Sequence, residues 1–228
     1  MRNASKVFRS GDVETTALRS ASIDIREGEF LVIIGPSGSG KSTLLNLIGG
    51  MDRPSSGQVF YQDSELSKYT DAQLTLYRRH EVGFVFQFYN LVPTLTALEN
   101  IEVATEIARN PVPAKEAVRL VGLEKRAGHF PAQMSGGEQQ RIAIARALAG
   151  NPKLMLCDEP TGALDMKTSR DVLRLLLRLN REMKKTVVVI THNMALAEIG
   201  DRVATIRDGE IASLQVNETP ADVEHVHW

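Results

Sequence analysis

Hydrophobic positions along this chain fall into short continuous runs separated by longer mixed stretches. The run at residues 30–34 is entirely apolar and rich in β-branched side chains, which predicts a buried strand. Similar runs, with the same prediction, are at residues 82–86, 153–157 and 186–190. Leucines that share one helical face between the last two runs predict a helix covering a sheet. These leucines are Leu173, Leu176, Leu177 and Leu179. The alternation of strands and helices predicts an α/β protein.

One block departs from this alternation. Residues 88–150 contain helical stretches interrupted by four prolines and show no strand pattern. We therefore predict a helical sub-domain at 88–150, inserted into an α/β core formed by residues 1–87 and 151–216. Together they make a single domain over the whole chain, residues 1–228.

The end of the chain carries two further patterns. Asp208-Gly209 lies between two apolar runs within residues 203–212, which is a β-hairpin signal. Residues 217–228 are mostly polar and are predicted to form a loose tail.

Composition narrows the class of protein. A content of 43% hydrophobic and 24% charged residues in 228 is that of a globular protein large enough for one sizeable core. The net charge of −1 argues against non-specific binding of nucleic acid. The single cysteine, Cys157, excludes an internal disulfide framework and fits a buried small hydrophobe. No apolar run is long enough to span a membrane and the first residues lack a secretory pattern, so we expect any membrane role to require a partner.

A glycine-rich segment follows the first apolar run. It fits the pattern G-x-x-x-x-G-K-[ST] at every fixed position, and residues 43–48 after it favour a helix. Backbone N–H groups of such a loop form an anion nest at the helix N-terminus. The lysine would reach the β- and γ-phosphates, and the final hydroxyl would take one position on Mg²⁺. The residues of this loop are Gly35, Pro36, Ser37, Gly38, Ser39, Gly40, Lys41 and Ser42.

Two acidic residues end the apolar run at 153–157. Asp158 and Glu159 would then lie at the carboxyl edge of the sheet, where α/β proteins bind ligands. Asp158 is suited to hold Mg²⁺ opposite Ser42, and Glu159 to act as general base on water. An acidic turn is common, but its combination with a phosphate loop favours catalysis.

A third segment resembles a helix start. Ser135 and Glu138 have the spacing of a capping box, and two glycines in the first turn, Gly136 and Gly137, leave N–H groups open to an anion. On physical grounds alone, a well-capped structural helix is the simpler interpretation.

The order of these motifs identifies a family. Residues 134–141, Met-Ser-Gly-Gly-Glu-Gln-Gln-Arg, resemble the signature motif of ATP-binding cassette (ABC) ATPases. Gln87 matches the family's Q-loop glutamine, residues 162–165 resemble its D-loop, and His192 matches its switch histidine. The resemblance covers residues 5–212 and implies a P-loop NTPase fold. That fold has a mainly parallel central sheet, an N-terminal antiparallel β portion and an inserted helical sub-domain.

The resemblance also implies a mechanism. ATP and Mg²⁺ would be the ligands, and two cassettes would face head to tail around two ATP molecules. Catalysis would rest on Glu159, His192, Lys41 and Gln87, with Ser42, Gln87 and Asp158 at the metal. Residues implied to contact nucleotide are Phe8, the phosphate loop with Thr43, the signature residues Ser135, Gly136, Gly137, Glu138 and Gln139, and Asp165.

Two departures from the family bear on these expectations. Phe8 stands where an adenine-stacking tyrosine is usual, and phenylalanine keeps the stacking face. The chain begins close to Phe8, so we expect little of the family's first strand.

Residues 86–100 are similar to cassettes of the macrolide-exporter and lipoprotein-releasing group. That resemblance implies an integral membrane permease with a large extracytoplasmic domain as partner, and a peripheral position at the cytoplasmic face of the membrane. Residues that could dock it, or could equally pack within the sub-domain, are Phe88, Tyr89, Leu91 and Leu95. A non-transport ABC ATPase, acting in mechanotransmission or in the cytoplasm, is the alternative, although the long coiled coil of DNA-maintenance members is missing. A P-loop kinase or GTPase would leave Ser135-Gly136-Gly137 unexplained.

Overall fold

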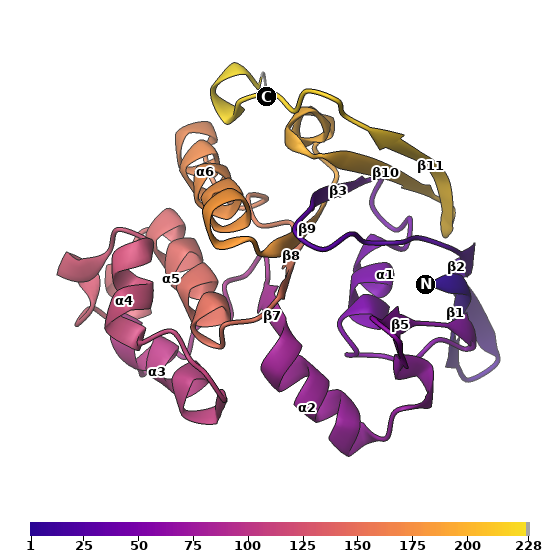
Figure 1. Cartoon of the computed structure of the whole chain (residues 1–228), viewed down its shortest axis with the longest axis horizontal. Helices are drawn as coiled ribbons and strands as arrows, with labels where there is room; N and C mark the ends of the chain where they lie inside the picture. The colour runs from indigo at the N-terminus through magenta and orange to yellow at the C-terminus, as the bar shows by residue number, and fades with distance from the viewer. Residues whose placement is uncertain (227–228) are drawn as a thin grey trace. The chain divides into compact units, whose positions relative to one another are not determined.

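The computed structural model of the protein describes residues 1–226. The chain divides into two compact units, Met1–Arg78 with Val188–Trp228, and Arg79–Val187. Figure 1 shows the elements of both units.

The first unit contains the strands that carry the phosphate loop. Four strands lie in the order β11-β10-β3-β9, with β10 parallel to β3 and antiparallel to β11 (Figure 1). Arg202 of β10 is opposite Leu31 of β3, and Thr205 is opposite Ile34. Every residue of β3 is buried, as expected for a parallel strand covered on both faces. The bounds are β3 Phe30–Ile34, β9 Thr186–Thr191, β10 Arg202–Arg207 and β11 Glu210–Val216.

A second, antiparallel sheet in this unit begins at the N-terminus. Its strand order is β2-β1-β4, with β1 at Arg2–Ser10, β2 at Val13–Ala21 and β4 at Ser56–Gln58. The expectation of a first strand that is largely missing is wrong, because β1 has nine residues and pairs on both sides. The other elements are α1 Lys41–Ile48, β5 Phe60–Tyr61, β6 Ser64–Glu65 and α2 Asp71–Glu81, with short 3₁₀ helices at Leu66–Lys68, Met194–Ile199 and Val223–His225.

The second unit pairs two parallel strands with four helices. Val82 of β7 is opposite Leu154 of β8, and residues 88–150 contain helices and no strand, as predicted. Helix α5 contacts both α3 and α4, and its apolar residues Ile142, Ile144 and Leu148 are fully buried. The bounds are β7 Val82–Val85, α3 Ala97–Ile107, α4 Ala114–Leu120, α5 Gly136–Ala149, β8 Leu154–Asp158 and α6 Met166–Met183, with 3₁₀ turns at Glu124–Arg126 and Pro131–Gln133.

The predicted α/β architecture, with an antiparallel N-terminal portion and a helical segment, is confirmed. The predicted loose tail is wrong for the described residues 217–226, while residues 227 and 228 lie outside the description. Asn217 donates to the carbonyls of Ala197 and Gly200, and Val223 and Val226 are buried. Burial of these two valines removes apolar surface from water and so stabilises the segment, although most of its residues are polar.

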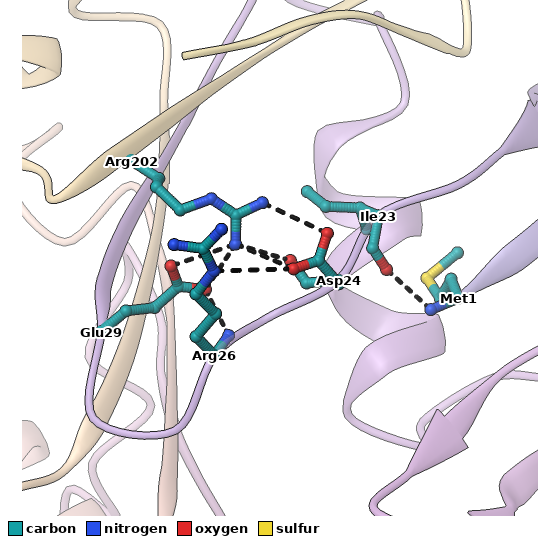
Figure 2. Close-up of polar contacts among 6 residues, drawn as sticks. All are labelled: Met1, Ile23, Asp24, Arg26, Glu29 and Arg202. Atoms are coloured by element: carbon teal, nitrogen blue, oxygen red, sulfur yellow. Dashed lines mark hydrogen bonds and ion pairs between the residues drawn. The ribbon is translucent and has the colours of Figure 1, made fainter. Parts of the chain in front are cut away.

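A buried ion pair of Arg202 and Glu29, joined by the exposed Asp24, ties β10 to the segment before β3 (Figure 2). The Arg202 guanidinium lies 3.1 Å from Asp24 and 3.3 Å from Glu29, and Arg202 and Glu29 are only 3% and 6% exposed. Burial raises the pKa of Glu29, whereas the hydrogen bond from Arg202 lowers the pKa of Asp24. The backbone N–H of Arg26 also donates to Glu29, at 2.6 Å.

We expect Arg202→Met to lower the free energy of unfolding by about 3 kcal/mol, because it leaves the Glu29 carboxylate buried without its cation. A carboxyl group with a raised folded pKa destabilises the fold once its unfolded form is ionised, so the loss should grow as pH rises from the ordinary pKa of a glutamate to the raised folded pKa of Glu29, and stay constant above it. Urea unfolding at several pH values measures this. Arg26→Met, which removes an exposed arginine 3.9 Å from Asp24, is the control. An equal effect of both variants at every pH would contradict the prediction.

Candidate nucleotide-binding and hydrolysis site

The phosphate loop joins β3 to α1 in the first unit. Gly38 and Gly40 adopt positive φ values of 77° and 100°, and Gly40 caps α1 without any side-chain hydrogen bond. The first N–H groups of the helix are therefore left for a ligand, as in anion sites at helix N-termini. Lys41 is buried, and its Nζ donates to the carbonyls of Gly35 and Pro36 at 2.8 and 2.9 Å. The ammonium group is thus held inside the loop.

Close packing behind the loop explains two of its glycines. A Cβ atom on Gly40 would lie 2.4 Å from the Ala17 carbonyl oxygen, and one on Gly35 would lie 2.3 Å from that of Ile206. Neither approach is tolerated by real Cβ atoms, so only glycine fits these positions.

The remaining predicted residues of the first unit lie at accessible places. Ser42 and His192 are exposed, Thr43 is half-buried, and Phe8 on β1 is 46% exposed. The Lys6 ammonium is 5.1 Å from the centroid of the Phe8 ring. His192 directly follows β9, and its neighbour Asn193 donates its backbone N–H to the Thr191 hydroxyl at 3.0 Å. The backbone that presents His192 is thereby fixed.

The acidic pair lies in the second unit, at the end of β8. Asp158 is the last residue of the strand, and Glu159 follows with a φ of 47°. A glutamate in this left-handed conformation is strained, and such strain clusters at functional sites. Cys157, next to them, is fully buried as predicted, and burial raises the pKa of its thiol well above the usual range.

Gln87 is close to this acidic turn. Its Nε2 is 3.0 Å from the position that a Cβ atom on Gly162 would take. The same point is 3.5 Å from Cβ of Glu159, and the N–H of Gly162 donates to the Glu159 carbonyl at 3.0 Å. The structure therefore brings together the predicted Q-loop, acidic pair and D-loop within one unit.

The predicted capping box at the start of α5 is present. The Ser135 hydroxyl accepts from the Glu138 N–H at 3.3 Å, and the Glu138 carboxylate accepts from the Ser135 N–H at 2.8 Å. That backbone bond, with Arg126 at 2.8 Å, lowers the pKa of Glu138. Ser135 is exposed, whereas Gly136 and Gln139 are half-buried. The first turn of α5 is thus rigidly presented.

The D-loop is packed against this helix start. Asp165 caps α6 by accepting from the backbone N–H of Thr168 at 3.1 Å and from its hydroxyl at 2.6 Å. These bonds lower the pKa of Asp165. A Cβ atom on Gly137 would lie 2.0 Å from Cγ2 of the same Thr168, so Gly137 is required for this contact.

Sequence reasoning missed one connection in this unit. Arg146 of α5 donates to the carbonyls of Tyr89 and Asn90 at 2.9 and 2.5 Å, and both of those residues have φ near 50°. The Tyr89 hydroxyl in turn is 2.7 Å from the place of a Cβ atom on Gly136. The bonds span more than fifty positions, so no local pattern could reveal them.

The four candidate docking residues differ in exposure. Phe88 is 77% exposed, while Tyr89, Leu91 and Leu95 are half-buried. Phe88 is therefore the residue of this group most available to a partner. Within residues 1–226, no helix has the length and apolar character needed to cross a membrane.

Known proteins share these features. The ABC transporter family model matches residues 18–162. The chain is 49% identical over 215 residues to an uncharacterized ABC transporter ATP-binding protein of Thermotoga maritima, and 92% of each chain is covered. It is 43% identical over 213 residues to the lipoprotein-releasing system ATP-binding protein LolD of Idiomarina loihiensis, covering 91% of this chain and 93% of that protein.

A solved structure of a cassette also matches this chain. The fold matches MJ0796, an ATP-binding cassette of Methanocaldococcus jannaschii, in a dimeric post-hydrolysis state bound to ADP and Pi. The TM-score is 0.87 at 44% identity, and the match covers 94% of this chain and 97% of that one. This chain therefore belongs to the ABC transporter family, as one of its ATP-binding, ATP-hydrolysing subunits.

Proposed function

We propose that two copies of this chain face head to tail around two ATP molecules and drive a membrane permease. Each ATP lies between the phosphate loop of one copy and the signature residues Ser135–Gly137 of the other. The observation that supports this proposal is the capping box at the start of α5. It holds Gly136 and Gly137 in the first helical turn, while Ser135 is exposed to solvent. The MJ0796 cassette bound to ADP and Pi is dimeric, which supports a pair of cassettes.

The side chains divide the chemistry between them. Water attacks the γ-phosphorus, the bond to the ADP oxygen breaks, and Glu159 accepts the proton of the water. Lys41 exchanges its bonds with the Gly35 and Pro36 carbonyls for the phosphate oxygens. Gln87 orients the attacking water, and His192 contacts the γ-phosphate.

The donor atoms also fit a magnesium ion. The exposed Ser42 hydroxyl and the Asp158 carboxylate at the end of β8 are the hard oxygen ligands that Mg²⁺ prefers. When bound, the ion neutralises charge on the phosphate oxygens. Gln87 completes the proposed set, and Phe8 offers its exposed ring to adenine.

The permease partner follows from the docking segment. Phe88, 77% exposed, is the apolar side chain of this segment most available to such a partner. The relative named for a lipoprotein-releasing system supports the lipoprotein-release subgroup. We propose for this subgroup a permease with a large extracytoplasmic domain, and a peripheral position of this chain at the cytoplasmic face of the membrane.

Affinity capture tests the permease proposal. Tagged Glu159→Gln, loaded with ATP and Mg²⁺, is incubated with detergent-solubilised membranes of the source organism, and its partners are identified by mass spectrometry. We expect recovery of a permease with a large extracytoplasmic domain, and we expect Phe88→Ser in the same background to recover far less of it. Capture of soluble partners alone would contradict the transporter role and favour a non-transport ABC ATPase.

An ATP site formed by two copies of the chain should depend on Ser135. Ser135→Arg should reduce ATP hydrolysis by about a hundredfold, the scale for losing one aligned donor to a phosphoryl group. ATP binding to the single chain should be retained, because the phosphate loop is untouched. Phosphate release and fluorescent-nucleotide binding measure the two quantities. Ser64→Arg, which alters an exposed serine elsewhere, is the control. Hydrolysis at the wild-type rate by Ser135→Arg would contradict the shared site.

A further inference from the structure

The turn between β10 and β11 lies against the phosphate loop, within the first unit. Asp208 and Gly209 form this turn with φ values of 51° and 81°. The Gly209 N–H donates to the carbonyl of Ser39, in the middle of the phosphate loop, at 3.1 Å. The Gly209 carbonyl accepts from the N–H of Arg19 on β2 at 2.8 Å. One residue thus links the loop to the antiparallel sheet.

The bond to Ser39 fixes the orientation of one peptide plane. Because a trans peptide places its C=O and N–H on opposite sides, holding the Ser39 carbonyl toward Gly209 directs the Gly40 N–H the other way. The Ser39 hydroxyl does not help to orient this peptide, because its Oγ is buried without a hydrogen-bond partner among the described residues. The Gly209 N–H is therefore the group that holds the Ser39 carbonyl.

Packing leaves no room for a side chain at Gly209. A Cβ atom on Gly209 would lie 2.9 Å from the Ala17 carbonyl oxygen and 3.1 Å from Cα of Leu18. A Cβ on Gly40 would meet the same Ala17 oxygen at 2.4 Å. Gly209 and Gly40 therefore lie close to one backbone carbonyl, and a Cβ atom at Gly209 must displace strand β2 or the turn itself.

We propose that Gly209 is a positioning residue for nucleotide binding, which holds the Ser39–Gly40 peptide in its phosphate-binding orientation. The proposal rests on the phosphate-loop role given above. Under this proposal, part of the ATP affinity depends on Gly209, which does not touch the nucleotide and is distant from the phosphate loop in the sequence. Displacement of the turn turns the peptide and removes one N–H donor from the anion nest.

A matched pair of substitutions tests this. Gly209→Ala and Gly11→Ala both place a Cβ on a residue of positive φ in a hairpin turn, but nothing lies within 4 Å of a Cβ at Gly11. Both variants place a side chain on a backbone of positive φ, 59° at Gly11 and 81° at Gly209, and only the second position has strand β2 in contact with the added atom. We expect Gly209→Ala to weaken ATP and ADP binding about tenfold, and Gly11→Ala to bind within twofold of the parent.

A spectroscopic readout separates positioning from loss of stability. The ³¹P resonance of the β-phosphate of bound ADP should shift in Gly209→Ala and stay in place in Gly11→Ala. Equal affinities and equal resonances in the two variants would overturn the proposal. Should Gly209→Ala fail to fold, amide hydrogen exchange in the parent protein gives the answer: ADP should slow exchange of the Gly209 N–H. Unchanged exchange would overturn the proposal as well.

Lys41→Ala separates the phosphate-loop assignment from the positioning role of Gly209. Undiminished ATP binding by Lys41→Ala would refute the phosphate-loop assignment itself, and with it the role of Gly209. Loss of binding in Lys41→Ala, together with intact binding in Gly209→Ala, would refute the role of Gly209 alone.

Discussion

Glu159→Gln is expected to lower the rate of ATP hydrolysis by about 10²–10⁴-fold while ATP still binds. Glutamine has nearly the shape of glutamate and keeps the Cβ atom, so the strained turn at a φ of 47° should persist. What it lacks is the ability to accept a proton from the attacking water. The loss should therefore fall on turnover and spare nucleotide affinity.

Single-turnover hydrolysis and equilibrium ATP binding measure the two effects separately. Glu182→Gln, which neutralises an exposed glutamate on α6, should hydrolyse ATP at the parent rate. Turnover by Glu159→Gln at the parent rate would remove Glu159 from the role of base.

Lys41→Ala is expected to weaken ATP binding by about 2–5 kcal/mol, which corresponds to a loss of roughly 30-fold or more. The Lys41 side chain is buried within the loop and donates to two carbonyl groups at 2.8 and 2.9 Å. Removing it takes away the positive charge opposite the phosphates and leaves both carbonyls without that donor.

Calorimetric titration with ATP measures this loss. Lys68→Ala, which removes an exposed lysine paired with Glu65, keeps the change in net charge the same and should bind ATP as the parent does. Equal binding by the Lys41 and Lys68 variants would contradict the assignment of the phosphate loop.

The sequence was sufficient where the signal is local. The phosphate loop, the acidic pair and the capped start of α5 are each a contiguous motif. The structure places the phosphate loop between β3 and α1, the acidic pair at the end of β8, and the capping box at the start of α5. The Ser135–Glu138 capping box could be predicted because it depends on a spacing of three residues.

Strand β1 and the chain end were mispredicted for physical reasons. The expectation of a short first strand rested on the position of Phe8 near the start, whereas β1 runs from Arg2 to Ser10 on both sides of Phe8 and is stabilised by pairing with β2 and β4. Val223 and Val226 are isolated among polar neighbours, so their burial depends on surfaces distant in the sequence.

The contacts that shape the site were beyond local reasoning altogether. The Asp208-Gly209 turn could be predicted as a hairpin, but not as the partner of Ser39. The bonds from Arg146 to the strained residues Tyr89 and Asn90 likewise join segments far apart in the chain. Such contacts depend on three-dimensional packing and leave no periodic signal.

The central claim is that ATP joins two copies of this chain through Ser135–Gly137. Its most direct test is the molar mass of Glu159→Gln in solution, measured by light scattering with and without ATP. We predict 25.1 kDa without nucleotide and twice that mass with ATP, and we predict that Ser135→Arg in the same background stays at 25.1 kDa. A mass of 25.1 kDa for Glu159→Gln at saturating ATP would contradict the account, as would ATP-driven doubling in the presence of Ser135→Arg.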